Sequence, residues 1–153
     1  MRDARLLAKP PVCRLGCLVL VRNPRGEVLL VDPDHLDGLI LPGGAARANE
    51  PPHEAAARHL FFETGFNLRL THLLAVDFTP ADRYLERLNL VFDGGTVTGH
   101  PTVPPRRRSG LFGAHFVPVT EIPAVMAPAQ AARVNEALTK RAVPLLLHGQ
   151  RAA

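Results

Sequence analysis

The apolar residues of this chain gather in short runs typical of β-strands, separated by residues that favour turns. Two such runs, 12–21 and 27–31, flank the turn sequence Asn23-Pro24-Arg25-Gly26, and this arrangement predicts a β-hairpin. A shorter extended piece over 39–41 leads into Pro42-Gly43-Gly44. Glycine at these positions allows a positive φ or a close approach of the backbone to a ligand.

One amphipathic helix is predicted over residues 51–64. Asn49 or Glu50 can cap its start, the two prolines that follow suit only a first turn, and Gly65 can end it in the left-handed conformation. The stripe expected to face the core, at i, i+3, i+4 and i+7, consists of Ala57, Leu60, Phe61 and Thr64.

Three side chains of the same helix, His59, Phe62 and Glu63, are expected to project away from that stripe. An aromatic ring outside the apolar stripe is not simply one more core residue. Phe62 is therefore a candidate for contact with a ligand or with the polar loop.

The rest of the chain continues the alternation of strands and turns. Strands are expected over 68–78, 88–92, 111–119 and 145–147, and a last helix over 128–142. The polar stretch 79–87 and the Pro-rich, basic stretch 99–110 are expected to be loops, and the Asp-Gly-Gly sequence at 93–95 is expected to end a strand. No repeat or linker divides the chain, so we predict one α+β domain over 1–153, with 1–10 flexible.

Composition narrows the class of protein without naming a function. The chain is 46% hydrophobic and 21% charged, as in a globular domain, and no apolar run approaches the roughly 18 residues of a membrane helix. Two cysteines, Cys13 and Cys17, make no disulfide framework, which favours a cytoplasmic protein. The net charge of +4 favours anionic ligands, but the run Arg106–Arg108 has no interleaved aromatic residues, so nucleic acid is not the expected partner.

The segment from the glycines to the end of the predicted helix resembles the signature box of the Nudix hydrolase superfamily. The residues that match the box at its spacing are Gly44, Glu50, Arg58, Leu60, Glu63, Gly65 and Phe66. His59 and Phe62 stand where the family carries glutamates that handle a metal ion. The resemblance implies a mixed β-sheet between helices.

The resemblance also implies a chemistry and roles for residues. Relatives hydrolyse a nucleoside diphosphate linked to another group, with Mg²⁺ or Mn²⁺. By this likeness Glu63 is catalytic and a metal ligand, and the carbonyl of Gly43 is a second ligand. Gly43, Gly44, Arg58 and Phe62 are expected to bind substrate, and Glu50 with Arg58 would brace the loop onto the helix.

The two departures from the box weaken the expected metal site. One carboxylate and a carbonyl hold a divalent ion loosely unless substrate phosphates complete its shell. His59 has three interpretations, as a metal ligand, as a general base, or as a polar residue without a role in chemistry. Glu86, in the loop before a strand, is the best candidate for a replacement carboxylate.

Three functions are compatible with this sequence. The first is a pyrophosphohydrolase with an impaired metal site and weak or altered activity on a small phosphate-containing ligand. The second is an inactive module that binds such a ligand or another metabolite, with no metal if the site is lost. The third is a metal-independent enzyme that uses His59 as acid or base. Substrate identity and homodimer formation are left open.

Overall fold

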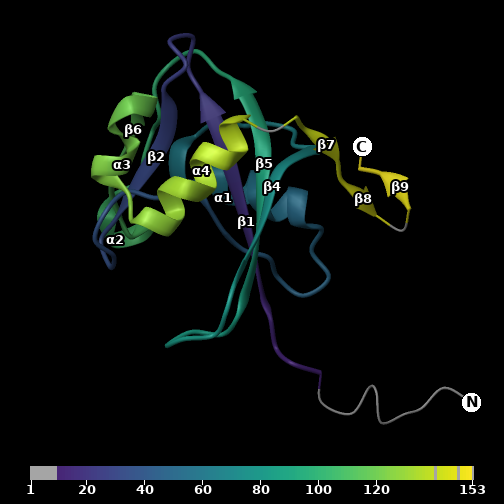
Figure 1. Ribbon diagram of the computed structural model, residues 1–153. Coiled ribbons are helices and arrows are strands. Elements are labelled where there is room, and N and C mark those ends of the chain that lie inside the picture. The colour runs from purple at the N-terminus through teal and green to yellow at the C-terminus, as the bar shows by residue number, and fades with distance from the viewer. Residues whose placement is uncertain (1–9, 140, 148, 153) are drawn as a thin grey trace, which may run out of the picture.

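The fold is built around one twisted mixed sheet. The computed structural model describes residues 10–139, 141–147 and 149–152. Seven strands form the sheet in the order β6-β2-β1-β5-β4-β7, with β3 paired to β1 (Figure 1). The pair β1 and β5 is parallel, and the other pairings are antiparallel. The strands are β1 (Arg14–Arg22), β2 (Val28–Pro33), β3 (Gly43–Ala45), β4 (His72–Thr79), β5 (Arg87–Thr96), β6 (Leu111–Val117) and β7 (Val143–Pro144).

Helices lie on both faces of this sheet. The helix α1 (Pro52–Thr64) packs on one face, and α3 (Ile122–Val125) and α4 (Pro128–Thr139) pack on the other (Figure 1). A single turn, α2 (Arg106–Ser109), precedes β6, and a 3-10 turn (Val119–Glu121) precedes α3. Near the C-terminus β8 (Leu146–Leu147) pairs with β9 (Gln150–Arg151). The predicted α+β class, with a mixed sheet between helices, is confirmed.

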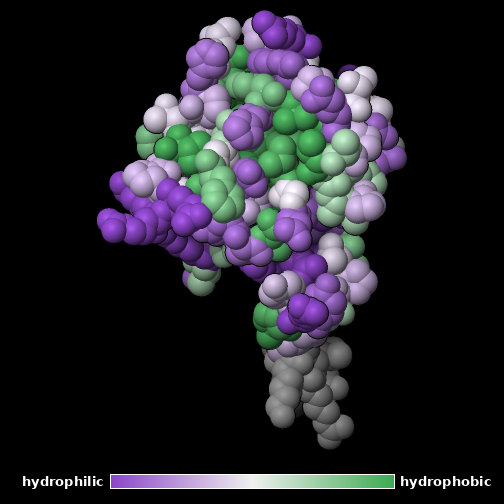
Figure 2. Space-filling model, turned by 90° about the vertical axis from the view of Figure 1, so that its left-hand side faces the viewer, coloured by the Kyte–Doolittle hydropathy of each residue, from purple (hydrophilic) through white to green (hydrophobic). Residues whose placement is uncertain are grey.

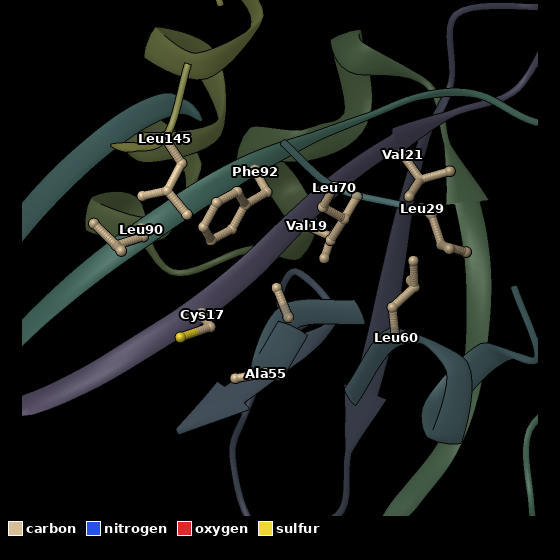
Figure 3. Packing of buried hydrophobic residues seen from close by; sticks show 11 residues of the cluster. Cys17, Val19, Val21, Leu29, Ala55, Leu60, Leu70, Leu90, Phe92 and Leu145 are labelled. Carbon is tan, nitrogen blue, oxygen red and sulfur yellow. The ribbon is translucent and has the colours of Figure 1, made fainter. Parts of the chain in front are cut away.

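The central strand β1 has apolar side chains on both of its faces, so helices must cover both sides of the sheet. Val19 and Val21 point to one face and pack in a cluster with Leu60 of α1 (Figure 3). Leu20 points to the other face and packs in a second cluster with Val134 of α4. Residues on both faces are fully buried, so the run is apolar throughout instead of alternating, as expected for a strand covered on both sides.

The predicted core stripe of α1 is only partly right. Leu60 and Thr64 are buried, but Ala57 is half-buried and Phe61 is 56% exposed. The residues that α1 buries are His53, Ala55, Ala56, Leu60, Glu63 and Thr64. The helix is therefore rotated relative to the prediction, with Glu63 on the buried side, where its carboxyl group meets the backbone of the glycine loop.

The C-terminal end of α1 agrees with the prediction, and its N-terminal end differs from it. Gly65 ends the helix with φ of 76°, as predicted. The N-cap is Pro51, and no side chain caps it, so the expected capping by Asn49 or Glu50 is wrong. Glu50 instead accepts hydrogen bonds from Arg47 and Arg58. Its carboxylate thus forms hydrogen bonds that hold the loop and does not cap the first turn of α1.

Other boundaries shift by a few residues. β4 begins at His72 instead of 68, and the described part of the last helix ends at Thr139. β5 continues through 93–95, because Gly94 lets it pass against β1, where an added Cβ would lie 2.6 Å from the side chain of Val21. The basic stretch 99–110 contains the turn α2. The expected strand over 145–147 is replaced by the short pieces β7 and β8, and most of the expected flexible segment 1–10 lies outside the described residues.

The two cysteines are both free thiols. Cys13 is exposed and Cys17 is buried in β1. Burial raises the pKa of the Cys17 thiol to about 11, and the nearby negative charge of Glu50 adds to the effect. In the portion of the chain that the structure describes, no helix has both the length and the apolar character needed to cross a bilayer.

We expect Leu60→Ala to lower the free energy of unfolding by about 2–5 kcal/mol, because it opens a cavity between α1 and the sheet. The matched control is Phe61→Ala, which removes a larger side chain that is 56% exposed and should cost much less. Urea denaturation of both variants measures the difference. An equal loss for the two would contradict the observed rotation of α1.

Candidate functional site

The candidate site forms where the end of α1 meets the glycine loop. Oε1 of Glu63 accepts a hydrogen bond from the backbone N–H of Gly43 at 2.8 Å. Gly43 has φ of 143°, and a Cβ there would collide with the carbonyl oxygen of Cys17 on β1. Only glycine lets the loop run so close to the strand while its N–H turns toward the helix.

Glu63 is an unusual carboxyl group because it is almost enclosed. It is 9% exposed, and burial raises its pKa to about 7, against the opposing effect of the Gly43 hydrogen bond. The side chain is therefore divided between its protonated and ionised forms near neutral pH. A cation or a further hydrogen-bond donor would shift it toward the carboxylate.

A second contact fixes the loop to the helix one turn earlier. Nε of Arg58 donates to Oε2 of Glu50 and the terminal guanidinium nitrogen donates to Oε1, each at 2.8 Å. The backbone N–H of Arg47 also donates to Glu50, at 3.0 Å. These donors lower the pKa of Glu50 to about 2, and the carboxylate raises the pKa of Arg58. The bidentate pair is the predicted brace between loop and helix.

His59 is turned to the same loop. Its Nε2 lies 3.0 Å from the carbonyl oxygen of Ala45, an acceptor, so this nitrogen carries the hydrogen. Its ring occupies the space beside Gly44, where an added Cβ would come within 2.6 Å of Nε2. Burial lowers the pKa of His59, so the neutral imidazole is favoured.

Phe62 lies on the exposed side of the helix end and is 39% exposed. The guanidinium of Arg108, in α2, stands 5.7 Å from the centre of its ring, within the range of a cation–π contact. The position that carries a glutamate in the box is thus occupied here by an apolar ring beside a cation.

Beside Gly43 and Glu63 lies a cavity of about 500 Å³. Glu63 is the one carboxylate among the described residues that line it. Basic groups are more numerous, and they are Arg14, His35, Arg87 and Arg133. Polar lining residues include Thr79, Asn89 and Gln130, and apolar ones include Leu18, Ile40 and Met126. A cavity with this lining suits an anionic ligand that also has an apolar or aromatic part.

Comparison with known proteins identifies the family. The sequence profile of the NUDIX domain matches residues 14–140, which is most of the chain. The chain belongs to the Nudix family. The expected membership, based on the box from Gly44 to Phe66, is therefore confirmed.

Individual relatives agree with this assignment. The chain is 28% identical over 121 residues to a putative 8-oxo-dGTP diphosphatase of Bacillus subtilis (strain 168), covering 79% of this chain and 77% of that protein. The MutT protein of Methanosarcina mazei Go1 superposes with a TM-score of 0.71 and 21% identity, covering 86% of this chain and 99% of that one. The NUDIX domain of Shewanella oneidensis NrtR, complexed with ADP ribose, has a TM-score of 0.66 and 15% identity over 91% and 100% of the two chains. At these identities the structures show the fold alone.

The structure brings together some of the expected Nudix site residues and separates others. Gly43, Gly44 and Glu63 all line the cavity. Arg58, His59 and Phe62 are not among its lining residues. Glu86 is half-buried directly before β5, where its carbonyl accepts from the N–H of Arg14, and its side chain is not part of the cavity lining either.

The donor groups do not by themselves fit a tightly held divalent ion. Within the described part of the chain, no group of three or more His, Cys, Asp or Glu side chains is placed to hold a metal together. Glu63 is the best candidate for a metal ligand, and its carboxyl group already accepts a hydrogen bond from the backbone N–H of Gly43. A hard divalent ion prefers several oxygen ligands, and here most of them would have to come from a bound phosphate or from water.

Sequence reasoning missed the basic lining of the cavity. Arg14, Arg87 and Arg133 come from β1, β5 and α4, so only the sheet topology reveals that they share one cavity. Arg133 is held by Asp77 of β4, whose carboxylate accepts from Nε at 2.7 Å. Parallel pairing aligns Arg14 with Arg87 on neighbouring strands. The one signal in the sequence was Arg14, a charged residue at the start of the otherwise apolar strand β1.

Glu63 should make stability depend on pH in a defined direction. Its raised pKa means that the folded protein retains a proton which the unfolded chain releases, so the contribution of Glu63 to stability is greatest below about pH 4.5 and falls as the pH rises to about 7. For one group, a tenfold difference in proton affinity between the folded and unfolded chains is worth about 1.4 kcal/mol. Glu63→Gln should remove this fall, so the variant gains stability relative to the parent between these pH values.

Urea denaturation at intervals from pH 4 to 8 measures this effect. Glu54→Gln removes an exposed carboxylate from the first turn of the same helix and controls for the change in net charge. If the parent and Glu63→Gln differ by a constant amount across this range, Glu63 is not the group that the structure describes.

Proposed function

We propose that the protein binds a nucleotide-derived diphosphate compound in the cavity beside Gly43 and Glu63, and that it hydrolyses this ligand slowly. The observation that carries the proposal is the composition of the cavity lining: Glu63 is its one carboxylate among the described residues, and three arginines also line it. Two of these arginines already have a carboxylate beside them, since Arg87 lies 3.6 Å from Asp82 and Arg133 lies 2.7 Å from Asp77. For Arg14 no ion pair is found among the described residues. Such a lining attracts phosphates, but it provides little of the negative charge that an efficient pyrophosphohydrolase uses to hold a divalent cation.

The arginines have the chemistry needed for phosphate. A guanidinium presents several N–H donors in a plane and can bind two phosphate oxygens at once. Arg14 and Arg87 are neighbours across β1 and β5, and Arg133 enters the lining from α4. The apolar part of the lining, with Leu18 and Ile40, supports the placement of a base or sugar next to the phosphates.

Any Mg²⁺ or Mn²⁺ would be weakly bound and would enter with the phosphates of the ligand. Glu63 and the carbonyl of Gly43 are the protein groups proposed to contact it. Within the family the general reaction is the attack of water on phosphorus. In this chain Gly43 and Gly44 are proposed to let the diphosphate approach the backbone, while Arg58 acts on the ligand through the loop that it braces.

The contacts of His59 support a structural role. A neutral imidazole that donates to Ala45 and fills the space beside Gly44 holds the loop in place. This favours the metal-assisted mechanism over the metal-independent one, in which His59 would be acid or base. Phe62 is proposed to contact the ligand at the edge of the site, where its ring is exposed.

The second candidate function is ligand binding without turnover. Partial protonation of Glu63 near neutral pH favours it, since a neutral carboxylic acid binds a cation poorly. One fold neighbour was solved with ADP ribose, and a sequence relative is named a putative 8-oxo-dGTP diphosphatase. These two compounds are the first ligands to test. The free thiols of Cys13 and Cys17 support a proposed cytoplasmic location.

The proposal is tested by adding ADP ribose or 8-oxo-dGTP with Mg²⁺ or Mn²⁺, reading both melting temperature and released product. We expect a rise in melting temperature together with slow, metal-dependent product formation. Glu63→Gln should lower the rate by at least about tenfold, with Glu54→Gln as the matched control.

Other outcomes of the same assay separate the candidates. Stabilisation by ligand without product supports the binding module. Turnover that survives chelator and is lost in His59→Ala supports the metal-independent enzyme. No stabilisation and no product with any diphosphate compound would refute the proposal.

Restoring the missing acidity should increase hydrolysis. The double variant His59→Glu/Phe62→Glu returns carboxylates to the two positions where the box is changed, and we expect turnover to rise by at least about tenfold with Mn²⁺. The control His59→Gln/Phe62→Leu changes the same positions without adding charge. A gain in both variants would mean that removing the original side chains, and not adding acidity, was responsible.

A further inference from the structure

We propose that α2 and the exposed aromatic rings beside it form a binding surface for a phosphate chain that carries aromatic bases. This arginine–aromatic surface consists of Arg106, Arg107, Arg108, Phe62 and Phe112. The ligand that this surface fits is single-stranded nucleic acid. The inference goes beyond the function proposed for the cavity and does not depend on it.

The charged part of the surface is the turn α2 itself. Arg106, Arg107 and Arg108 are consecutive and all exposed. None of the three is paired with a carboxylate among the described residues. Strongly hydrophilic side chains project at the left border of the face that carries α2 and α3 (Figure 2). Three neighbouring unpaired guanidiniums repel one another, and a polyanion relieves this repulsion.

The aromatic part is interleaved with these cations. The guanidinium of Arg106 stands 5.0 Å from the ring centre of Phe112, and that of Arg108 stands 5.7 Å from the ring centre of Phe62. Phe112 is 60% exposed and Phe62 is 39% exposed, so neither ring is a core residue. In the sequence no aromatic residue interrupts the arginine run. Phe112 follows Arg108 by four residues, and Phe62 comes from the end of α1.

The two rings come from different elements and meet at α2. Phe112 lies at an irregularity of the β2–β6 ladder, because Leu111 pairs with Pro33 and Gly113 pairs with Asp32, which leaves Phe112 between them without a partner in the ladder. The turn α2 joins the two elements, since its arginines contact a ring on each.

This combination has a specific chemical match. Arginine binds phosphate through its planar N–H donors, and exposed aromatic rings and guanidinium planes stack on bases of any sequence. A simple polyanion would use the arginines but leave the rings uncovered. The surface also borders the cavity, because Ser109 and Gly110, directly after Arg108, belong to the cavity lining.

The test uses the full-length protein and a fluorescein-labelled single-stranded dT12 oligonucleotide, with binding followed by fluorescence anisotropy. We expect binding that weakens with salt, with a slope of log K against log salt of about −2 if three phosphates are neutralised. Arg106→Glu/Arg107→Glu/Arg108→Glu should weaken binding at least about tenfold and flatten the slope. The matched control, Arg25→Glu/Arg69→Glu/Arg83→Glu, makes the same change of net charge at exposed sites elsewhere.

The rings are tested separately from the charge. Phe62→Leu/Phe112→Leu should weaken binding by about tenfold, the order expected for lost base stacking, while the salt slope is unchanged. Circular dichroism and melting temperature show whether each variant is folded, and a single Phe112→Leu variant replaces the double one if it is not. Equal binding by the arginine variant and its control, or no effect of the ring variants, would overturn the proposal.

Competition identifies the source of the ligand. We expect longer oligonucleotides to displace the labelled strand and ADP not to do so. Displacement by ADP at similar concentration would show that a free nucleotide is bound instead and would overturn the proposal. Inorganic polyphosphate of equal charge should compete much less well than dT12. If it competes as well, the bases are not recognised and the inference is wrong.

Discussion

The hydrogen bond between the N–H of Gly43 and the carboxyl group of Glu63 is the contact on which the arrangement of the site depends. It joins a loop residue to a helix residue twenty positions later, and it is made in a nearly enclosed space. A buried carboxyl group needs such a partner, because an unsatisfied one is costly. The bond therefore links the path of the glycine loop past β1 to the end of α1, and the buried face of that helix is also held by Leu60 in the core. The Glu50–Arg58 pair then secures the remainder of the loop.

Much of the fold could be predicted because it follows from local patterns. The strands, the helix that ends at Gly65 and the brace between Glu50 and Arg58 all have signals within a short stretch of sequence. The rotation of α1 could not be predicted, since the apolar stripe counted Phe61 as core and took no account of a carboxyl group drawn inward by a backbone N–H. Helical periodicity assigns faces by hydropathy. Here the buried face contains Ala56 and Leu60 and also a carboxyl group that has a backbone hydrogen-bond partner.

The site residues that are close together in the sequence were predicted, and those that only the fold brings together were not. Gly44 and Glu63 belong to one motif, Gly43 directly precedes it, and all three line the cavity. The arginines opposite them come from distant strands and a helix, so their convergence is a property of the topology. The same holds for Phe62 beside α2, whereas Phe112 is only four residues from Arg108 in the sequence. The lining therefore contains more basic side chains than the motif alone indicates, and this is the basis for the phosphate ligand that we propose.

The different surroundings of the two cysteines have a practical consequence. The thiol of Cys17 is enclosed in β1, and its pKa of about 11 leaves almost no thiolate at neutral pH, whereas Cys13 is exposed. Alkylating reagents attack thiolates that they can reach. The native chain therefore carries a single addressable attachment point for a probe, one residue before β1, without any engineered cysteine.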